Sequence, residues 1–273
     1  MDSLKNSNIN MRDKLKDESY FDSFLDDTYK SLEKRIVKLN SVLIKDERII
    51  PVKKAMSSSY LHIIHAKFSN GDYLEKLKSD FHNGIKLMNE SLTGNNGKVH
   101  VTKSQYLDQY YIHIYQEVLQ YLSLAYFLEV SNEDFQILVD IIDRDNISDN
   151  LYEFIIKARF PNREQKRPEE YDTKQSVILK VYDKLRKATE TEDKVEASKL
   201  IKQFLEKDFY HKHMNLYNSH NSKADIYCGY WSFETAAVVK IMGLDDSSFI
   251  DNQYYPKDLV HQTALTSKKK GLF

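Results

Sequence analysis

The chain has 273 residues, enough for one large domain or two modest ones. Hydrophobic residues make up 41% of it and the formal net charge is −1, so a real core is expected and an overall basic field for nucleic acid is excluded. The single cysteine excludes an internal disulfide framework and a cysteine-based zinc site.

Turn-forming residues are scarce, with 7 glycines and 4 prolines in the whole chain. Strand-rich proteins need such residues at short intervals, so the sequence favours an all-α fold. We expect a two-part helical bundle built from antiparallel helix pairs. The polar N-terminus has no apolar run of the kind found in a secretory signal.

The first third of the chain predicts three helices after a flexible arm at residues 1–17. Pro51 is expected to begin the second helix, which runs to about Phe68, and a turn follows at Asn70 and Gly71. Asp72 and Glu75 are spaced as in a capping box, so a third helix is expected from there to about Leu92. The first helix is predicted from a mainly apolar stripe of residues at spacings of three and four: Phe21, Phe24, Leu25, Thr28, Leu32, Ile36, Leu39 and Leu43.

The middle of the chain predicts a central helix over residues 103–129. Thr102 and Gln105 form a second capping-box pattern in front of it, and the helix carries few charges and six tyrosines. A helix that is apolar nearly all round usually lies at the centre of a bundle. Ser131 and Asp134 predict the start of the next helix, which is expected to run through Ile142.

A charged, proline-flanked segment at residues 160–170 is interpreted as a surface crossover between two halves. The expected domains are therefore an N-terminal helical domain at 18–158 and a C-terminal helical domain at 171–260, with a flexible tail at 261–273. Helices are predicted at 172–189, 193–211 and 230–242. Gly243 suits a left-handed helix cap, and Pro256 suits the first turn of a short terminal helix.

The run from Leu244 to Asp258 mixes carboxylates with aromatic residues. Tyrosine is enriched at the centres of protein interfaces, and carboxylates at the rim steer basic partners. The same residues could instead cap turns and pack in the core. The candidate partner-binding residues are Asp245, Asp246, Asp251, Tyr254, Tyr255 and Asp258.

Histidines offer the main candidates for catalytic chemistry. His62 and His65 could share one helix face, and His211 and His213 lie close to Asp208, but neither pair has the spacing of a zincin motif. No nucleophile elbow, P-loop or dinucleotide-binding motif occurs. A metal-dependent helical hydrolase therefore stays open only as an alternative, and Cys228 is interpreted as a small buried thiol.

The C-terminal third resembles the PoNi family, bacterial immunity proteins against polymorphic nuclease effectors. The residues that carry the resemblance begin with Gly229, Tyr230, Trp231, Ser232, Phe233 and Glu234, continue through Ala236–Lys240 and Leu244–Phe249, and end with Tyr255–Val260. In the N-terminal half the resemblance rests on Arg12 and Asp13, on Ser69–Asp72 and on Tyr121–Ala125.

This resemblance implies a two-part all-α protein that binds a cognate DNase toxin in the cytoplasm, in the setting of type VI secretion and interbacterial competition. The toxins of the family resemble PD-(D/E)xK nucleases, whose cleft the inhibitor would occlude. No cofactor, no turnover, no direct nucleic-acid contact and no membrane are expected, and a homodimer is left open. A generic helical interaction scaffold is a second alternative. A structural role is assigned to Gly229, Tyr230, Trp231, Phe233, Glu234, Gly243 and Pro256.

Overall fold

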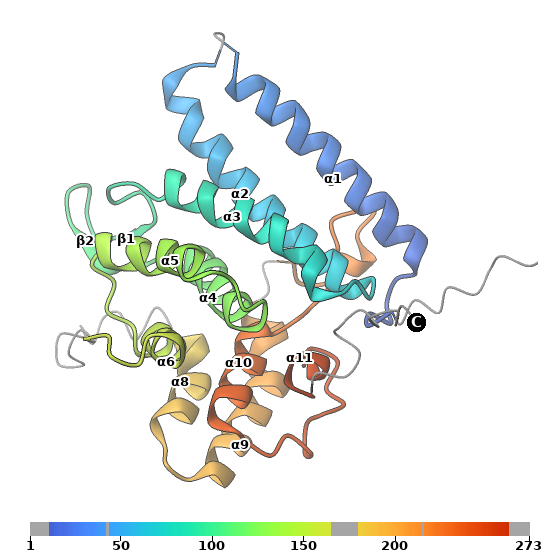
Figure 1. Cartoon of the computed structure of the whole chain (residues 1–273), viewed down its shortest axis with the longest axis vertical. Helices are drawn as coiled ribbons and strands as arrows, with labels where there is room; N and C mark the ends of the chain where they lie inside the picture. The colour runs from blue at the N-terminus through green and yellow to red at the C-terminus, as the bar shows by residue number, and fades with distance from the viewer. Residues whose placement is uncertain (1–10, 42–43, 165–179, 214–215, 262–273) are drawn as a thin grey trace, which may run out of the picture.

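Two long antiparallel helices open the fold (Figure 1). The computed structural model describes residues 11–41, 44–164, 180–213 and 216–261, with α1 at Glu18–Leu39 and α2 at Asp46–Ser69. The carboxylate of Asp17 caps α1 by accepting the Tyr20 N–H at 2.9 Å. Pro51 was expected to begin α2 but lies inside it, because Asp46 and Glu47 start the helix one turn earlier, where acidic residues favour the N-terminus.

A short 3₁₀ turn at Leu74–Leu77 leads into α3, at Lys78–Ser91. The turn expected at Asn70 and Gly71 is confirmed, and Gly71 has a positive φ of 91°. The capping box expected at Asp72 is wrong: the Asp72 carboxylate accepts a hydrogen bond from Lys76 Nζ at 2.6 Å and does not cap a helix. Helix α3 packs along α2 (Figure 1).

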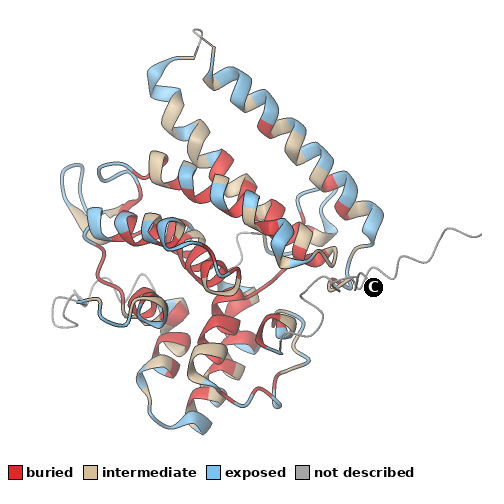
Figure 2. Ribbon diagram, viewed as in Figure 1, coloured by how far each residue is buried: buried red, intermediate tan, exposed pale blue. Residues whose placement is uncertain are grey.

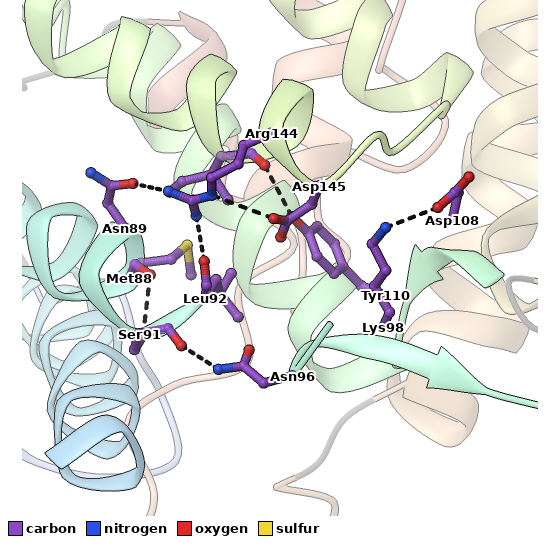
Figure 3. Close-up of polar contacts among 11 residues, drawn as sticks. Met88, Asn89, Ser91, Leu92, Asn96, Lys98, Asp108, Tyr110, Arg144 and Asp145 are labelled. Carbon is purple, nitrogen blue, oxygen red and sulfur yellow. Dashed lines mark hydrogen bonds and ion pairs between the residues drawn. The ribbon is translucent and has the colours of Figure 1, made fainter. Parts of the chain in front are cut away.

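A β-hairpin replaces the start of the predicted central helix, with β1 at Lys98–His100 and β2 at Tyr106–Tyr110. The Thr102 hydroxyl accepts the Gln105 N–H at 3.1 Å, as a capping box would require, but it closes the hairpin turn. The buried Tyr110 hydroxyl donates to Asp145 at 2.7 Å, and Arg144 binds Asp145, Asn89 and the Leu92 carbonyl (Figure 3). These contacts fix the hairpin against α3 and α5.

Helix α4, at Ile112–Phe127, lies at the centre of the molecule and contacts α2, α5, α6 and α10. Its central position is as predicted, although it begins nine residues later than the sequence suggested because of the hairpin. Helix α5 spans Asn132–Arg144 and begins, as expected, with the Ser131 hydroxyl accepting the Asp134 N–H at 3.1 Å. Helix α6, at Asn150–Arg159, was not predicted and is capped by Asp149.

The C-terminal half begins with a 3₁₀ turn at Lys180–Tyr182 and α8 at Asp183–Glu190, so residues 172–179 of the predicted helix lie outside the described residues. Helix α9, at Lys194–Gln203, continues as a π-helical segment at Phe204–His213. A 3₁₀ turn at Ser219–Asn221 precedes α10, at Phe233–Met242, and α11, at Lys257–His261. The predicted cap is confirmed: Gly243 has a φ of 59°.

The fold is mainly helical, as predicted, and its core is shared by both halves. One buried cluster of apolar side chains runs from Leu61 on α2 to Val260 on α11, and Figure 2 shows the buried faces turned toward one another. Residues 11–17, expected to belong to a flexible arm, pack against the end of α2 through Arg12 and Asp13. Among the described helices, none combines the length and apolar character needed to cross a bilayer.

Candidate functional site

Ser69, the last residue of α2, joins the segment at Arg12 and Asp13 to the segment at residues 228–231. Its carbonyl accepts the backbone N–H groups of Arg12 and Asp13 at 3.0 and 3.1 Å. Its hydroxyl donates to the Cys228 carbonyl at 3.0 Å and accepts the Trp231 indole N–H at 2.8 Å. This buried serine therefore satisfies backbone groups from both ends of the sequence.

Arg12 strengthens this junction with its guanidinium. Nε donates to Asp258 at 3.0 Å, Nη1 donates to the carbonyls of Phe68 and Asp72, each at 3.0 Å, and the guanidinium lies 4.4 Å from the Phe68 ring centre. Lysine is a poor substitute for a guanidinium that stacks on a ring and donates three hydrogen bonds in fixed directions. The Arg12 side chain thus ties the N-terminal segment to Phe68, Asp72 and Asp258.

Gly229 lets the C-terminal segment approach α2 closely. Its φ is 112°, and a Cβ at this position would lie 2.2 Å from Ser69 Oγ and 2.6 Å from Trp231 Nε1. Only glycine fits this backbone and this contact. Next to it, Tyr227 donates from its hydroxyl to Asp13 at 2.5 Å, and burial together with that carboxylate raises the Tyr227 pKa.

A groove of about 340 Å³ lies between residues 11–15 and residues 250–258. Its floor is aromatic, formed by Phe68, Tyr227, Tyr230 and Trp231. Its mouth carries charged side chains, namely Lys14, Asp251 and Lys257. The groove thus combines an aromatic floor with polar and charged walls, which is the character of a binding site.

Three tyrosines extend the groove outward, and we call Tyr210, Tyr217 and Tyr254 the tyrosine ledge. Tyr254 lines the groove and stacks on Tyr210, with ring centres 5.1 Å apart and 12° between the planes. Tyr217 packs against Tyr210 at 4.8 Å and is 57% exposed. The π-helical segment carries Tyr210 and places it against Tyr254.

The six candidate partner-binding residues divide into groups. Asp251, Tyr254, Tyr255 and Asp258 line the groove, whereas Asp245 and Asp246 do not. Asp245 is exposed and accepts the Ser247 N–H at 3.0 Å.

Asp246, by contrast, is buried, and it accepts hydrogen bonds from the Tyr255 hydroxyl at 2.8 Å and from His261 Nε2 at 2.7 Å. Both Asp246 and Tyr255 therefore face inward. Asp258 is held by Arg12, so Asp251 and Tyr254 are the most accessible of the four groove residues.

The residues assigned a structural role are mostly buried. Phe233 and Glu234 lie in the core on α10, and Pro256 is buried just before α11. The Tyr230 hydroxyl accepts the His220 N–H at 3.2 Å. Burial raises the pKa of Glu234 to about 7, against a smaller opposing effect of its own backbone N–H and the Ser232 hydroxyl.

Two of the histidine candidates, His62 and His65, lie together in a buried recess. His62 and His65 line a recess of about 50 Å³ beside Glu117, and burial lowers their pKa values to about 4 and 3. His65 Nε2 bonds the Gln120 side-chain oxygen at 3.0 Å. Across the described residues, no three His, Cys, Asp or Glu side chains are placed to hold a metal ion. His211 is exposed, and the His213 side chain lies outside what the structure describes.

Sequence reasoning missed the groove and the ledge, because both combine residues from distant parts of the chain. Arg12 and Ser69 contributed to the family resemblance, but no pattern assigned them a shared junction. Tyr210 and Tyr217 carried no local signal beyond their residue type. The nearest usable signal was the acidic-aromatic run from Leu244 to Asp258, which contains Tyr254.

Two family models match most of the chain. Residues 12–140 match the family model described as PoNe immunity protein (PoNi), N-terminal, and residues 147–259 match PoNe immunity proteins (PoNi), C-terminal. The first matched range thus ends at residue 140 and the second begins at residue 147. No curated protein and no solved structure matches the chain. The chain belongs to the family of PoNe immunity proteins.

Proposed function

We propose that this protein neutralises a cognate secreted DNase by binding it directly, in the cytoplasm, where the DNA to be protected lies. The proposed target is a PD-(D/E)xK-like nuclease delivered between bacteria by type VI secretion. The protein acts as a stoichiometric inhibitor without turnover and occludes the cleft that holds DNA and metal. Membership of the PoNe immunity family supports the class of partner.

The observation that carries direct binding is the accessible ring surface of the tyrosine ledge, where Tyr217 is exposed and Tyr210 and Tyr254 are half-buried beside the groove. Tyrosine rings supply large, rigid contact area at low conformational cost, which suits the centre of a protein interface. The junction at Ser69 and Arg12 holds both walls of the groove in place. We propose Asp251, Tyr254 and Asp258 as the contact residues within the groove, and Asp245 as a rim carboxylate.

The test is DNA degradation by the nuclease domain of the effector, with and without the purified protein. Inhibition that saturates at one protein per nuclease is expected, with an interface of about 1,600 Å² or more. Nuclease activity that continues at a several-fold excess of the protein would contradict direct neutralisation. Micromolar binding to several unrelated proteins would instead indicate a general helical scaffold.

A further inference from the structure

We infer that the groove receives an arginine side chain of the effector, held by the Asp251 carboxylate and the ring of Tyr254. This inference rests on the proposed function and adds the chemistry of the contact. The partner is thus a nuclease that presents a guanidinium at its surface, and the groove is the site that recognises it.

The aromatic lining favours a cation. The face of an aromatic ring carries partial negative charge, so cations are attracted to it. Two cations of the chain already use rings in this region: Arg12 lies over Phe68 at 4.4 Å, and Lys16 Nζ lies 4.7 Å from the centre of the Tyr20 ring. Beyond these, the groove offers further ring surface at Tyr254.

The accessible carboxylate favours a guanidinium. Asp251 has an 87% exposed side chain, and its ion pair with Lys257 at 2.9 Å joins two exposed groups. Such pairs contribute little to stability, so Asp251 can exchange Lys257 for a partner's side chain at small cost. A planar guanidinium can bind a carboxylate through two parallel hydrogen bonds, which an ammonium cannot do.

The effector supplies the complementary charge. A nuclease must hold DNA phosphates with cationic side chains, and these lie in the cleft that an inhibitor would cover. Lys14 and Lys257 oppose an incoming cation, because both lie at the groove mouth, and the Lys14 charge acts on Asp251. Both lysines compete with the incoming guanidinium for the Asp251 carboxylate. Removing a lysine and removing the Asp251 charge should therefore change the affinity in opposite directions.

The first experiment measures the affinity of the effector's nuclease domain for variants of the full chain. Asp251→Asn should weaken binding by about tenfold, because a charge-assisted hydrogen bond is lost. Lys257→Ala and Lys14→Ala should each tighten binding by about two- to threefold, because a competitor is removed. Asp140→Asn on α5 is the matched control, because Asp140 is exposed and lies outside the groove, and it should leave the affinity unchanged.

Opposite signs, with weaker binding for the lysine variants and tighter binding for Asp251→Asn, would show that the groove takes an acidic group and would overturn the inference. Unchanged affinity in all three groove variants, with the nuclease still inhibited, would overturn the inference and leave the proposed function standing. Failure of the parent protein to bind or inhibit the nuclease would overturn both.

A second experiment tests the groove without the effector. Trp231 is the only tryptophan of the chain and lines the groove, so its fluorescence reports occupancy directly. Titration of the full chain with N-acetyl-arginine amide should give a saturable change in emission that Asp251→Asn reduces. N-acetyl-citrulline amide, which has the same shape without the charge, should give none. No response to either compound, or an equal response to both, would contradict recognition of a guanidinium here.

Discussion

Tyr121 on α4 and Tyr217 on the ledge are the same residue type in opposite environments. Tyr121 is completely buried, and its hydroxyl donates to the Ser57 carbonyl at 2.9 Å. Tyr217 is 57% exposed and contacts mainly the Tyr210 ring. The interior region around α4 uses tyrosine to fill space and satisfy backbone groups, whereas the groove region keeps ring surface available. Tyrosine content alone therefore does not identify a binding surface, and accessible ring area does.

Trp231→Ala tests whether the groove floor belongs to the core. The indole is 7% exposed and its N–H is bonded to Ser69, so the substitution should destabilise the protein by about 3–5 kcal/mol. Urea denaturation followed by circular dichroism measures this loss. A loss below about 1 kcal/mol would show that the floor is a loose surface and would remove the contrast with the α4 region.

Glu234→Gln sharpens the description of the interior. A carboxyl group whose pKa is about 7 in the folded state, above its ordinary value of 4.5, holds its proton more tightly when folded. Its contribution to stability is complete below pH 4.5 and is lost as the pH rises through 7. Near pH 8, glutamine should therefore stabilise the protein by about 3 kcal/mol relative to glutamate.

Near pH 4, this advantage of Glu234→Gln should disappear. Denaturation of both proteins at several pH values measures the difference. Parallel pH profiles would mean that Glu234 is hydrated in the folded protein. The neighbouring region carries the opposite trend, because His62 and His65 have lowered pKa values and their contribution is lost as the pH falls below 6.5.

Asp246→Asn and Asp245→Asn separate structural from accessible carboxylates beside the groove. Asp246 is buried and accepts two hydrogen bonds, so its replacement should cost about 2 kcal/mol. An asparagine at position 245 can still accept the Ser247 N–H. The free energy of unfolding of Asp245→Asn should therefore stay within about 0.5 kcal/mol of the parent value. Thermal unfolding compares the two. Equal losses would mean that adjacent carboxylates share one environment.

Tyr217→Ala should have the smallest effect on folding. Its ring is largely exposed, so the free energy of unfolding should change by less than about 0.5 kcal/mol. Tyr121→Ala, the matched change in the interior, should cost about 3–5 kcal/mol. Similar losses in the two variants would show that the ledge is packed as tightly as α4 and does not keep a surface free.

Local patterns in the sequence predicted local structure well. The start signal at Ser131 and the cap at Gly243 lie where helices begin or end. Thr102 and Gln105 show the limit of this reasoning, because their hydrogen bond forms but closes a hairpin. The hairpin is held in place by the bond from Tyr110 to Asp145, between residues 35 positions apart. No short window of sequence contains that contact.

The candidate site could be predicted only in part. The acidic-aromatic segment was identified, and Asp251, Tyr254, Tyr255 and Asp258 do line one groove. The opposite wall, at residues 11–15, is brought there by Arg12, which bonds Asp258 across 246 positions of sequence. Neighbours such as Asp245 and Asp246 differ in burial because only Asp246 meets Tyr255 and His261. These long-range contacts, and not residue type, decide which carboxylates are accessible.

The most direct test of binding through the groove and ledge is the affinity of the nuclease domain for a Tyr217→Ala, Tyr254→Ala double variant. Isothermal titration against the parent protein gives the ratio of dissociation constants. Tyr126→Ala is the control, a half-buried tyrosine on α4 whose ring packs on Phe127. We predict a loss of at least about tenfold for the double variant, with folding retained, and no loss for the control. Parental affinity in a folded double variant would contradict binding through this surface.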